Sequence, residues 1–183
     1  MEKVTYDKEL TALLVIDPYN DFISEGGKVW DRLRTVAEAN GRVPHMLRIL
    51  NAARKAELRV FYALHHRYRS GDYETWKYLA RIQQAAWGHK TFEYGTWGGE
   101  IRPEFSPQPG DIVALEHWCS SGFANTDLDL QLETHGDHLL IAVGFGTYVR
   151  GGHRTLYRRA RVPGYGGERR DRELRAGPYA RRS

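Results

Sequence analysis

The feature that most constrains the fold is a continuous, largely apolar segment, Leu10–Ile16, that stops at Asp17 and Pro18. A strand with one face in water alternates apolar and polar residues, whereas an uninterrupted apolar run is typical of a strand covered on both faces. Such strands occur in parallel sheets with helices on each side. Three later segments also predict strands: Leu58–Leu64, Ile112–Leu115 and Leu139–Val143.

Helical patterns lie between these strands. Pro44 suits a first helical turn, and the apolar residues that follow fall on one stripe: Met46, Ile49, Leu50, Ala53 and Ala56. A short helix is expected over Asp72–Ala86, and Thr126 is expected to cap a helix ending at Gly136. This alternation predicts an α/β fold with three αβα layers and a mainly parallel, Rossmann-like sheet.

Ligands of such sheets bind beyond the carboxyl ends of the strands. Three places meet that condition in this sequence. They are Asp17 after the first strand, Glu116 and His117 after the third, and residues 144–150 after the fourth. We therefore expect these segments to share one functional edge.

The carboxy-terminal part differs in composition from the rest. Residues 147–183 contain 11 arginines against three acidic residues, which leaves 16 basic and 20 acidic residues before them. The sequence pI of about 9.2 thus describes the tail and not the body. No strand-like apolar run follows residue 147, so we predict one α/β domain over 1–146 and an atypical tail over 147–183, with the sheet truncated at its carboxy-terminal end. Nucleic-acid binding is not expected, because the aromatic interleaving and ordered motif of a recognition module are absent.

Composition narrows the remaining classes of protein. A single cysteine excludes an internal disulfide framework and suits a reducing compartment. No apolar run approaches the length of a membrane span, and the first residues lack the order of a secretory signal. We expect a cytoplasmic protein that does not contact membranes. Gly144-Phe145-Gly146 lacks the further glycine and lysine of a phosphate-binding loop, and we expect no cofactor.

Three blocks of residues, in order along the chain, resemble one known family. Residues 13–22 (LLVIDPYNDF) are similar to the family's first-strand signature, and residues 94–100 (YGTWGGE) to an active-site loop of one subgroup. Residues 110–113 (GDIV) with 121–128 (SGFANTDL) resemble its third strand and threonine-capped helix. The family is that of the isochorismatase-like cysteine hydrolases, and the resemblance covers residues 10 to about 145. It implies an α/β hydrolase for a small amide, ester or vinyl ether, and self-association into a homo-oligomer.

The resemblance also implies a catalytic triad of aspartate, lysine and cysteine. The thiolate attacks a carbonyl or imine-like carbon, the aspartate takes the thiol proton, and the lysine holds charge near both. Asp17 matches the aspartate, and a carboxylate that ends a buried strand suits a general base. The alternative is that Asp17 only starts a turn before Pro18.

The other site residues are less closely matched. No lysine follows the third strand, where Glu116 and His117 are the polar groups, and His117 could carry charge near neutral pH. The alternative is that both only line the strand end. Phe22, Trp97 and Phe123 are candidates for the substrate pocket walls, with core packing as the alternative for each.

Two further groups of residues are candidates for a nucleophile and for metal ligands, but the sequence around them does not support either role. Cys119 precedes the helix, where the family has no nucleophile, so an ordinary partly buried cysteine is expected. His65 and His66 end the second strand, where related nicotinamidases place metal ligands. Arg67 follows instead of the aspartate and spaced histidine that such a site needs, so we expect no metal.

The family's nucleophile falls at or next to Arg150, counting from Gly144. Arginine cannot be deprotonated in proteins, so thiol catalysis at this position is impossible for the chain as written. With GC-rich codons of our own choice, residues 146–154 can be written GGC ACG TAC GTG CGC GGC GGC CAC CGC. Dropping the first base gives Ala-Arg-Thr-Cys-Ala-Ala-Ala-Thr, which restores the family's Thr-Cys-x-x-Ala-Thr. We predict a frameshift near Gly144, with a diverged basic tail as the alternative.

The sequence thus predicts a hydrolase scaffold that is impaired as translated. A non-catalytic homologue, which binds a small molecule or serves as a subunit of an oligomer, is the alternative.

Overall fold

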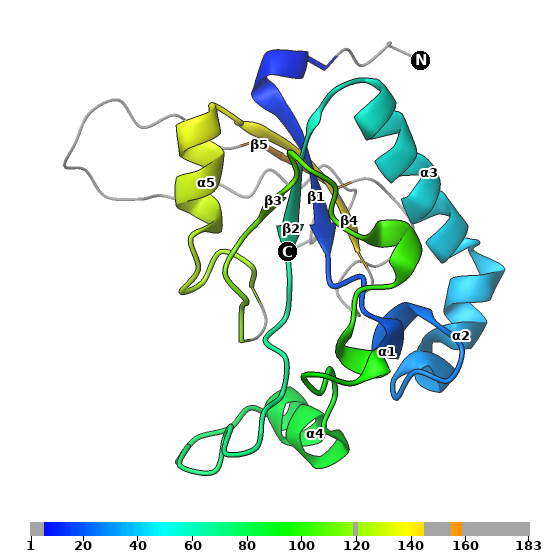
Figure 1. Ribbon diagram of the computed structural model, residues 1–183, viewed down its shortest axis with the longest axis vertical. Coiled ribbons are helices and arrows are strands. Elements are labelled where there is room, and N and C mark those ends of the chain that lie inside the picture. The colour runs from blue at the N-terminus through cyan, green and yellow to red at the C-terminus, as the bar shows by residue number, and fades with distance from the viewer. Residues whose placement is uncertain (1–5, 119–120, 145–154, 159–183) are drawn as a thin grey trace, which may run out of the picture.

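A five-stranded sheet forms the centre of the computed structural model, which describes residues 6–118 and 121–144 and the backbone of 155–158 (Figure 1). The strand order is β3-β2-β1-β4-β5, in which the first four strands are parallel and β5 is antiparallel to β4. The strands are β1 (Thr11–Ile16), β2 (Arg59–Ala63), β3 (Ile112–Val113), β4 (Leu139–Gly144) and β5 (Thr155–Arg158).

The central strand β1 is covered on both faces, as its apolar run predicted. Ala12 and Leu14 pack into one core cluster, and Leu13 and Val15 into the other. All four side chains are buried. Since successive side chains of a strand point to opposite faces, only a continuous apolar run could fill both clusters.

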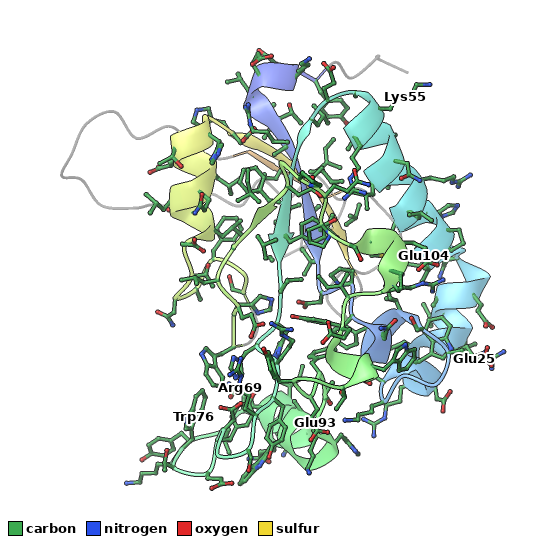
Figure 2. All side chains as sticks on the ribbon, viewed as in Figure 1. Glu25, Lys55, Arg69, Trp76, Glu93 and Glu104 are labelled. Carbon is green, nitrogen blue, oxygen red and sulfur yellow. The ribbon has the colours of Figure 1, made fainter. Side chains whose placement is uncertain are left out.

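Helices cover the sheet on each side and form the two outer layers of the fold, and Figure 2 shows the side chains on this framework. The helices α1 (Asn20–Ile23), α2 (Trp30–Ala39) and α3 (Arg42–Lys55) lie on one face, and α5 (Leu128–His135) lies on the other (Figure 1). Short 3-10 turns η1 (Lys8–Leu10), η2 (Trp97–Gly99) and η3 (Pro103–Phe105) and the helix α4 (Arg81–His89) complete the described elements. The expected three-layer α/β architecture is confirmed.

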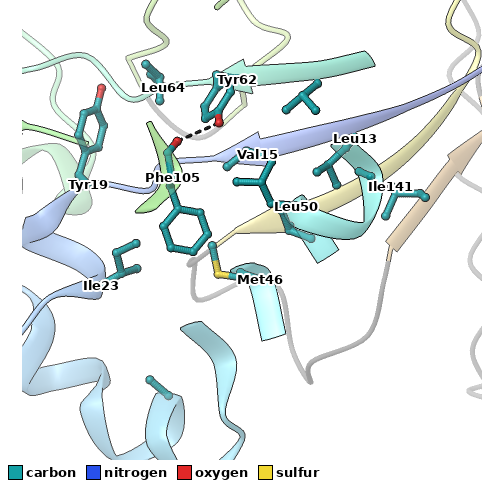
Figure 3. Close-up of a cluster of buried hydrophobic side chains, with 14 of the residues drawn as sticks. Leu13, Val15, Tyr19, Ile23, Met46, Leu50, Tyr62, Leu64, Phe105 and Ile141 are labelled. Carbon is teal, nitrogen blue, oxygen red and sulfur yellow. Dashed lines mark hydrogen bonds between the residues drawn. The ribbon is translucent and has the colours of Figure 1, made fainter. Parts of the chain in front are cut away.

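The core beneath α3 reaches the end of the sheet where the strands finish. Met46 and Leu50 of α3 pack with Val15 and Phe105, and the Tyr62 hydroxyl donates a 2.8 Å hydrogen bond to the Phe105 carbonyl (Figure 3). This bond ties η3 to β2. The loop that carries η2 and η3 is therefore fixed against the sheet.

The register aligns the strand ends that position the site. Ile16 pairs with Ala63 on one side and with Gly144 on the other. A Cβ added to Gly144 would lie 2.8 Å from the Ile16 Cβ, so the two backbones approach closely. The chain that leaves β4 therefore starts at the same edge of the sheet as Asp17.

The predicted start of one helix was wrong. The helix expected over 72–86 begins only at Arg81, because Tyr73 has φ of 68° and Asp72 accepts from the Arg69 N–H in a turn. Such a positive φ cannot continue a right-handed helix. By contrast, Gly136 ends α5 at φ of 77°, and the Thr126 hydroxyl accepts from the Leu128 N–H at 3.3 Å, close to the predicted cap.

The expectation that no strand follows residue 147 was also wrong. The backbone of β5 pairs with β4 from Leu139 to Ala142. An open strand edge presents unpaired N–H and C=O groups, so even a short segment pairs there without a strong apolar pattern. Arg150 and the rest of the 147–183 tail lie outside the described residues. Among the helices that the structure describes, none has the length and hydrophobicity that crossing a membrane requires.

Candidate functional site

Asp17 is held at the junction of β1 and β2. Its φ is 50°, its backbone N–H donates to the Ala63 carbonyl, and its Oδ1 accepts a 2.6 Å hydrogen bond from the His65 N–H. The side chain is only 13% exposed. Both polar ends of Asp17 are thus anchored on β2, which fixes where the carboxylate points.

His117 lies beside Asp17, although it follows a different strand. Its N–H donates to the Leu64 carbonyl, and its own carbonyl accepts from the His66 N–H. The ring is buried, and its Nε2 lies 3.3 Å from Asp17 Oδ1. This approach lacks hydrogen-bond geometry, and neither ring nitrogen has a hydrogen-bond partner among the described residues. A buried imidazole next to a carboxylate can hold or pass a proton.

His65 is the third polar side chain at this edge. Its ring centroid lies 5.4 Å from that of His117, and its Nδ1 lies 2.8 Å from the His66 carbonyl oxygen. Burial lowers the pKa of His65, and the Asp17 carboxylate only partly opposes this shift. From the sequence His65 was expected to be an ordinary strand-end histidine, although the carboxyl-end rule, applied to the second strand, places it at this edge.

The Glu116 carboxylate is bound by Arg67. Its Oε1 accepts a 2.7 Å hydrogen bond from Arg67 Nε, and its Oε2 accepts from the Arg67 N–H. Burial alone would raise the pKa of Glu116, but His66 and the two Arg67 donors together lower it to about 2. Of the two candidates for the lysine position, His117 lies at Asp17, and Glu116 does not.

His66 links Glu116 to the loop that follows β2. Its Nε2 lies 2.9 Å from Asp72 Oδ2, and its Nδ1 lies 3.4 Å from Glu116 Oε2. The ring also stacks on Trp118, with centroids 3.8 Å apart. Because carboxylates flank both ring nitrogens, the doubly protonated imidazolium fits this place best.

The three aromatic candidates lie in different surroundings. The Phe22 ring packs edge-on against Phe92 at 4.6 Å, which is a core contact. Trp97 is 53% exposed, and its carbonyl accepts from the Asn20 side chain. Phe123 is 41% exposed. No ring contact among the described residues joins these three to one another.

The other acidic residue of the LLVIDPYNDF motif serves the scaffold. Asp21 is buried, and its two carboxylate oxygens accept from the Lys28 and Phe92 N–H groups at 3.0 and 2.7 Å. A Cβ on Gly98 would overlap this carboxylate. Asp21 therefore fixes the loop before η2 against α1 and requires glycine at position 98.

Two predicted positions cannot be placed. Arg150, at the expected nucleophile position, and Cys119 both lie outside the described residues. Within the described part of the chain, no group of three or more His, Cys, Asp or Glu side chains is arranged to hold a metal ion.

Comparison with known proteins finds relatives that agree with one family. A family model for the isochorismatase domain matches residues 11–149. The ureidoacrylate amidohydrolase RutB of Rhizobium rhizogenes is 29% identical over 163 residues, which cover 81% of this chain and 64% of that protein. The corresponding protein of Caulobacter segnis is 33% identical over 160 residues, covering 81% of this chain and 66% of its own length. The chain thus spans a little under two thirds of these relatives.

Solved structures share the fold. A cysteine hydrolase from Pseudomonas syringae superposes with a TM-score of 0.62 at 22% identity, covering 79% of this chain and 63% of its own. N-carbamoylsarcosine amidase from Thermoplasma acidophilum gives 0.53 at 27% identity, with 73% and 66% covered. With a family model that matches most of its length, the chain belongs to the isochorismatase family of hydrolases.

Proposed function

We propose that this chain is a hydrolase scaffold for a small-molecule C–N amide bond, with an ester or vinyl ether as less favoured substrates. The observation that carries the proposal is the contact between the Asp17 carboxylate and the His117 imidazole at the carboxyl ends of the parallel strands. Relatives named as an amidohydrolase and an amidase favour the C–N bond.

In this proposal Asp17 takes a proton from the attacking group and later returns it to the leaving nitrogen. The His65 N–H bond to Oδ1 aims the carboxylate for that role. His117 takes the place beside Asp17 that the family resemblance gives to the lysine, because its Nε2 lies 3.3 Å from the same carboxylate oxygen. An acid and a base held this close provide the general acid–base half of an acyl-transfer site.

The nucleophile half is impaired in the chain as written. Arg150 occupies the position that the family resemblance gives to cysteine, and a guanidinium cannot attack carbon. We attribute this to a one-base frameshift near Gly144. The nucleotides of the gene test that cause directly: an uninterrupted tail frame with no Thr-Cys-x-x-Ala-Thr in another frame would rule it out.

Function is tested by ammonia release from nicotinamide and N-carbamoyl-β-alanine. We expect background rates from the chain as written, and at least a thousandfold more from a version with the reading frame restored after Gly144. Such a factor corresponds to roughly 4 kcal/mol of transition-state stabilisation. Asp17→Asn should return the restored version to background, whereas Asp31→Asn, at an exposed position of α2, should not.

The outcomes separate the parts of the proposal. Asp17-dependent turnover by the chain as written would refute impairment. A folded, frame-restored chain that hydrolyses no amide, ester or vinyl ether would refute the hydrolase assignment.

A non-catalytic binder is the second candidate, and the arginine at the nucleophile position favours it. A binder is expected to bind an amide saturably, and the concentration of the amide should stay constant over time because none is hydrolysed. Self-association into a homo-oligomer stays a prediction for either function. Sedimentation velocity in the analytical ultracentrifuge measures the oligomeric state.

A further inference from the structure

The peptide group between Leu64 and His65 bridges Asp17 and His117. Its carbonyl accepts a 2.8 Å hydrogen bond from the His117 N–H, and its N–H donates a 2.6 Å bond to Asp17 Oδ1. The angle of this peptide group therefore sets where the Asp17 carboxylate lies relative to His117.

The next peptide group along the chain, between His65 and His66, is held by Tyr19. Its carbonyl accepts a 2.8 Å hydrogen bond from the Tyr19 hydroxyl, and its N–H donates a 2.7 Å bond to the His117 carbonyl. Both peptide groups are planar and share the His65 Cα, so holding the second limits how far the first can turn. The Tyr19 hydroxyl thus acts, one peptide group removed, on the N–H that binds Asp17.

The backbone that carries Tyr19 is itself fixed. Tyr19 forms an antiparallel bridge with Ile101, and the Pro18 carbonyl accepts a 2.9 Å hydrogen bond from the Arg102 N–H. Pro18 also separates Asp17 from Tyr19, and its ring restricts the backbone between them. The two side chains therefore hold residue 65 from a rigid segment.

Core packing alone does not account for a tyrosine at position 19. Its buried ring lies 4.7 Å from that of Phe92, and phenylalanine would make the same contact. What tyrosine adds is the hydroxyl. Burial, together with the charges of Glu116 and Asp17, raises the pKa of Tyr19, so the hydroxyl keeps the proton that it donates.

We propose that Tyr19 is a positioning residue of this site: its hydroxyl fixes the His65 carbonyl and, through the two peptide groups, keeps the Asp17 carboxylate in place beside His117. Misplacing a reacting group by about 1 Å can cost about a hundredfold in rate. The anchor therefore matters for turnover more than for substrate binding. The inference rests on the proposed function, because it assigns Tyr19 to the same reaction.

Tyr19→Phe removes the hydroxyl and keeps the ring, and Tyr62→Phe is its matched control. Tyr62 is also buried, and its hydroxyl also donates a 2.8 Å hydrogen bond to a loop carbonyl, that of Phe105 (Figure 3). The two variants thus lose the same kind of bond, but only Tyr19 contacts residue 65.

Amide hydrogen exchange of the full chain as written, followed by NMR, gives a readout that needs no turnover. The His65 N–H is compared with the N–H groups of Leu13 and Val15 in β1, which report opening of the whole fold. The ratio of these exchange rates should rise at least about tenfold in Tyr19→Phe and stay within about twofold of wild type in Tyr62→Phe.

The second readout is ammonia release from N-carbamoyl-β-alanine and nicotinamide by the frame-restored version. Tyr19→Phe should lower kcat at least about tenfold and leave KM within about twofold. Tyr62→Phe should leave both within about twofold. Circular dichroism measures the folded fraction of each variant, to which kcat is referred.

Equal exchange ratios in the two variants would overturn the proposal, because Tyr19 would then contribute only to overall stability, as Tyr62 does. A wild-type kcat in Tyr19→Phe would overturn it as well. If the frame-restored version hydrolyses neither amide, the hydrolase proposal is what fails. The exchange ratio still decides, in that case, whether Tyr19 holds the peptide groups of His65.

Discussion

The Asp17 carboxylate lies 3.3 Å from Nε2 of His117, and this contact joins the end of β1 to the end of β3 across the intervening β2. Beside the end of β2, next to these two side chains, lie two small residues, Gly122 and Ala63. Gly122 packs on Ala63, where an added Cβ would lie 2.9 Å from the Ala63 Cβ and 3.8 Å from His117 Cδ2. The site therefore depends on a glycine that takes no part in chemistry.

Gly122→Ala should destabilise the fold by about 1–3 kcal/mol, the usual cost of overpacking. The added methyl must displace the Ala63 side chain, because the two Cβ atoms would lie only 2.9 Å apart. Urea denaturation measures the loss. Gly88→Ala is the matched control, because nothing lies within 4 Å of its added Cβ in α4, and alanine favours a helix over glycine by about 1 kcal/mol. Equal effects of the two changes would contradict the close packing at Gly122.

The backbone of Asp17 predicts how its variants differ in stability. At φ of 50° a short side chain with local hydrogen bonding is favoured, and Oδ1 also accepts from the His65 N–H. Asp17→Asn retains both properties, whereas Asp17→Ala leaves a buried donor unsatisfied. We expect Asp17→Ala to cost about 1–3 kcal/mol more than Asp17→Asn. Thermal unfolding of the two variants at one pH measures this difference, and identical midpoints would show that the bond contributes nothing.

The fold could be predicted from the sequence further than the site. The apolar run of β1 determined a strand buried on both faces, and the carboxyl-end rule located Asp17. Glu116 and His117 could not be separated, because a shift of one residue along an extended chain turns a side chain to the opposite face. Only the pairing of the His117 backbone with Leu64 and His66 settles which of the two faces Asp17.

Features that depend on contacts between residues far apart in the chain could not be predicted from the sequence either. Because Tyr73 has a positive φ, the helix α4 begins later in the chain than predicted. No local sequence pattern indicates this positive φ. The segment 155–158 is too short to be recognised as a strand before the open edge of β4 is known. A pocket of about 250 Å³ is lined by Arg67, which follows β2, and by Glu100, which follows η2, and only the folded chain brings these two loops together.

His66 should make stability depend on pH. Burial alone would lower the pKa of His66, but its contacts with Glu116 and Asp72 raise it above the ordinary 6.5. The imidazolium therefore contributes stability that is fully present below the unfolded pKa and is lost as pH rises through the folded pKa. The ring is partly exposed, so solvent screening reduces the effect.

The measurement is the urea midpoint of wild type and His66→Gln between about pH 5.5 and about pH 8.5. The difference between the two proteins should be largest at the acidic end and should shrink as the pH increases. A difference that grows with pH would mean that His66 is bound as the neutral ring.

Asp21 and Gly98 should act as one unit. Asp21→Asn places an amide N–H₂ against either the Lys28 or the Phe92 N–H, since both carboxylate oxygens accept from backbone donors. The resulting buried mismatch should cost about 2–3 kcal/mol, against less than about 0.5 kcal/mol for Asp31→Asn at the surface. Gly98→Ala should cost a similar amount, because its methyl overlaps the same carboxylate. With both changes the loss should be smaller than the sum of the two single losses, since each displaces the same group. Strict additivity in a double-mutant cycle would show that Gly98 does not pack on Asp21.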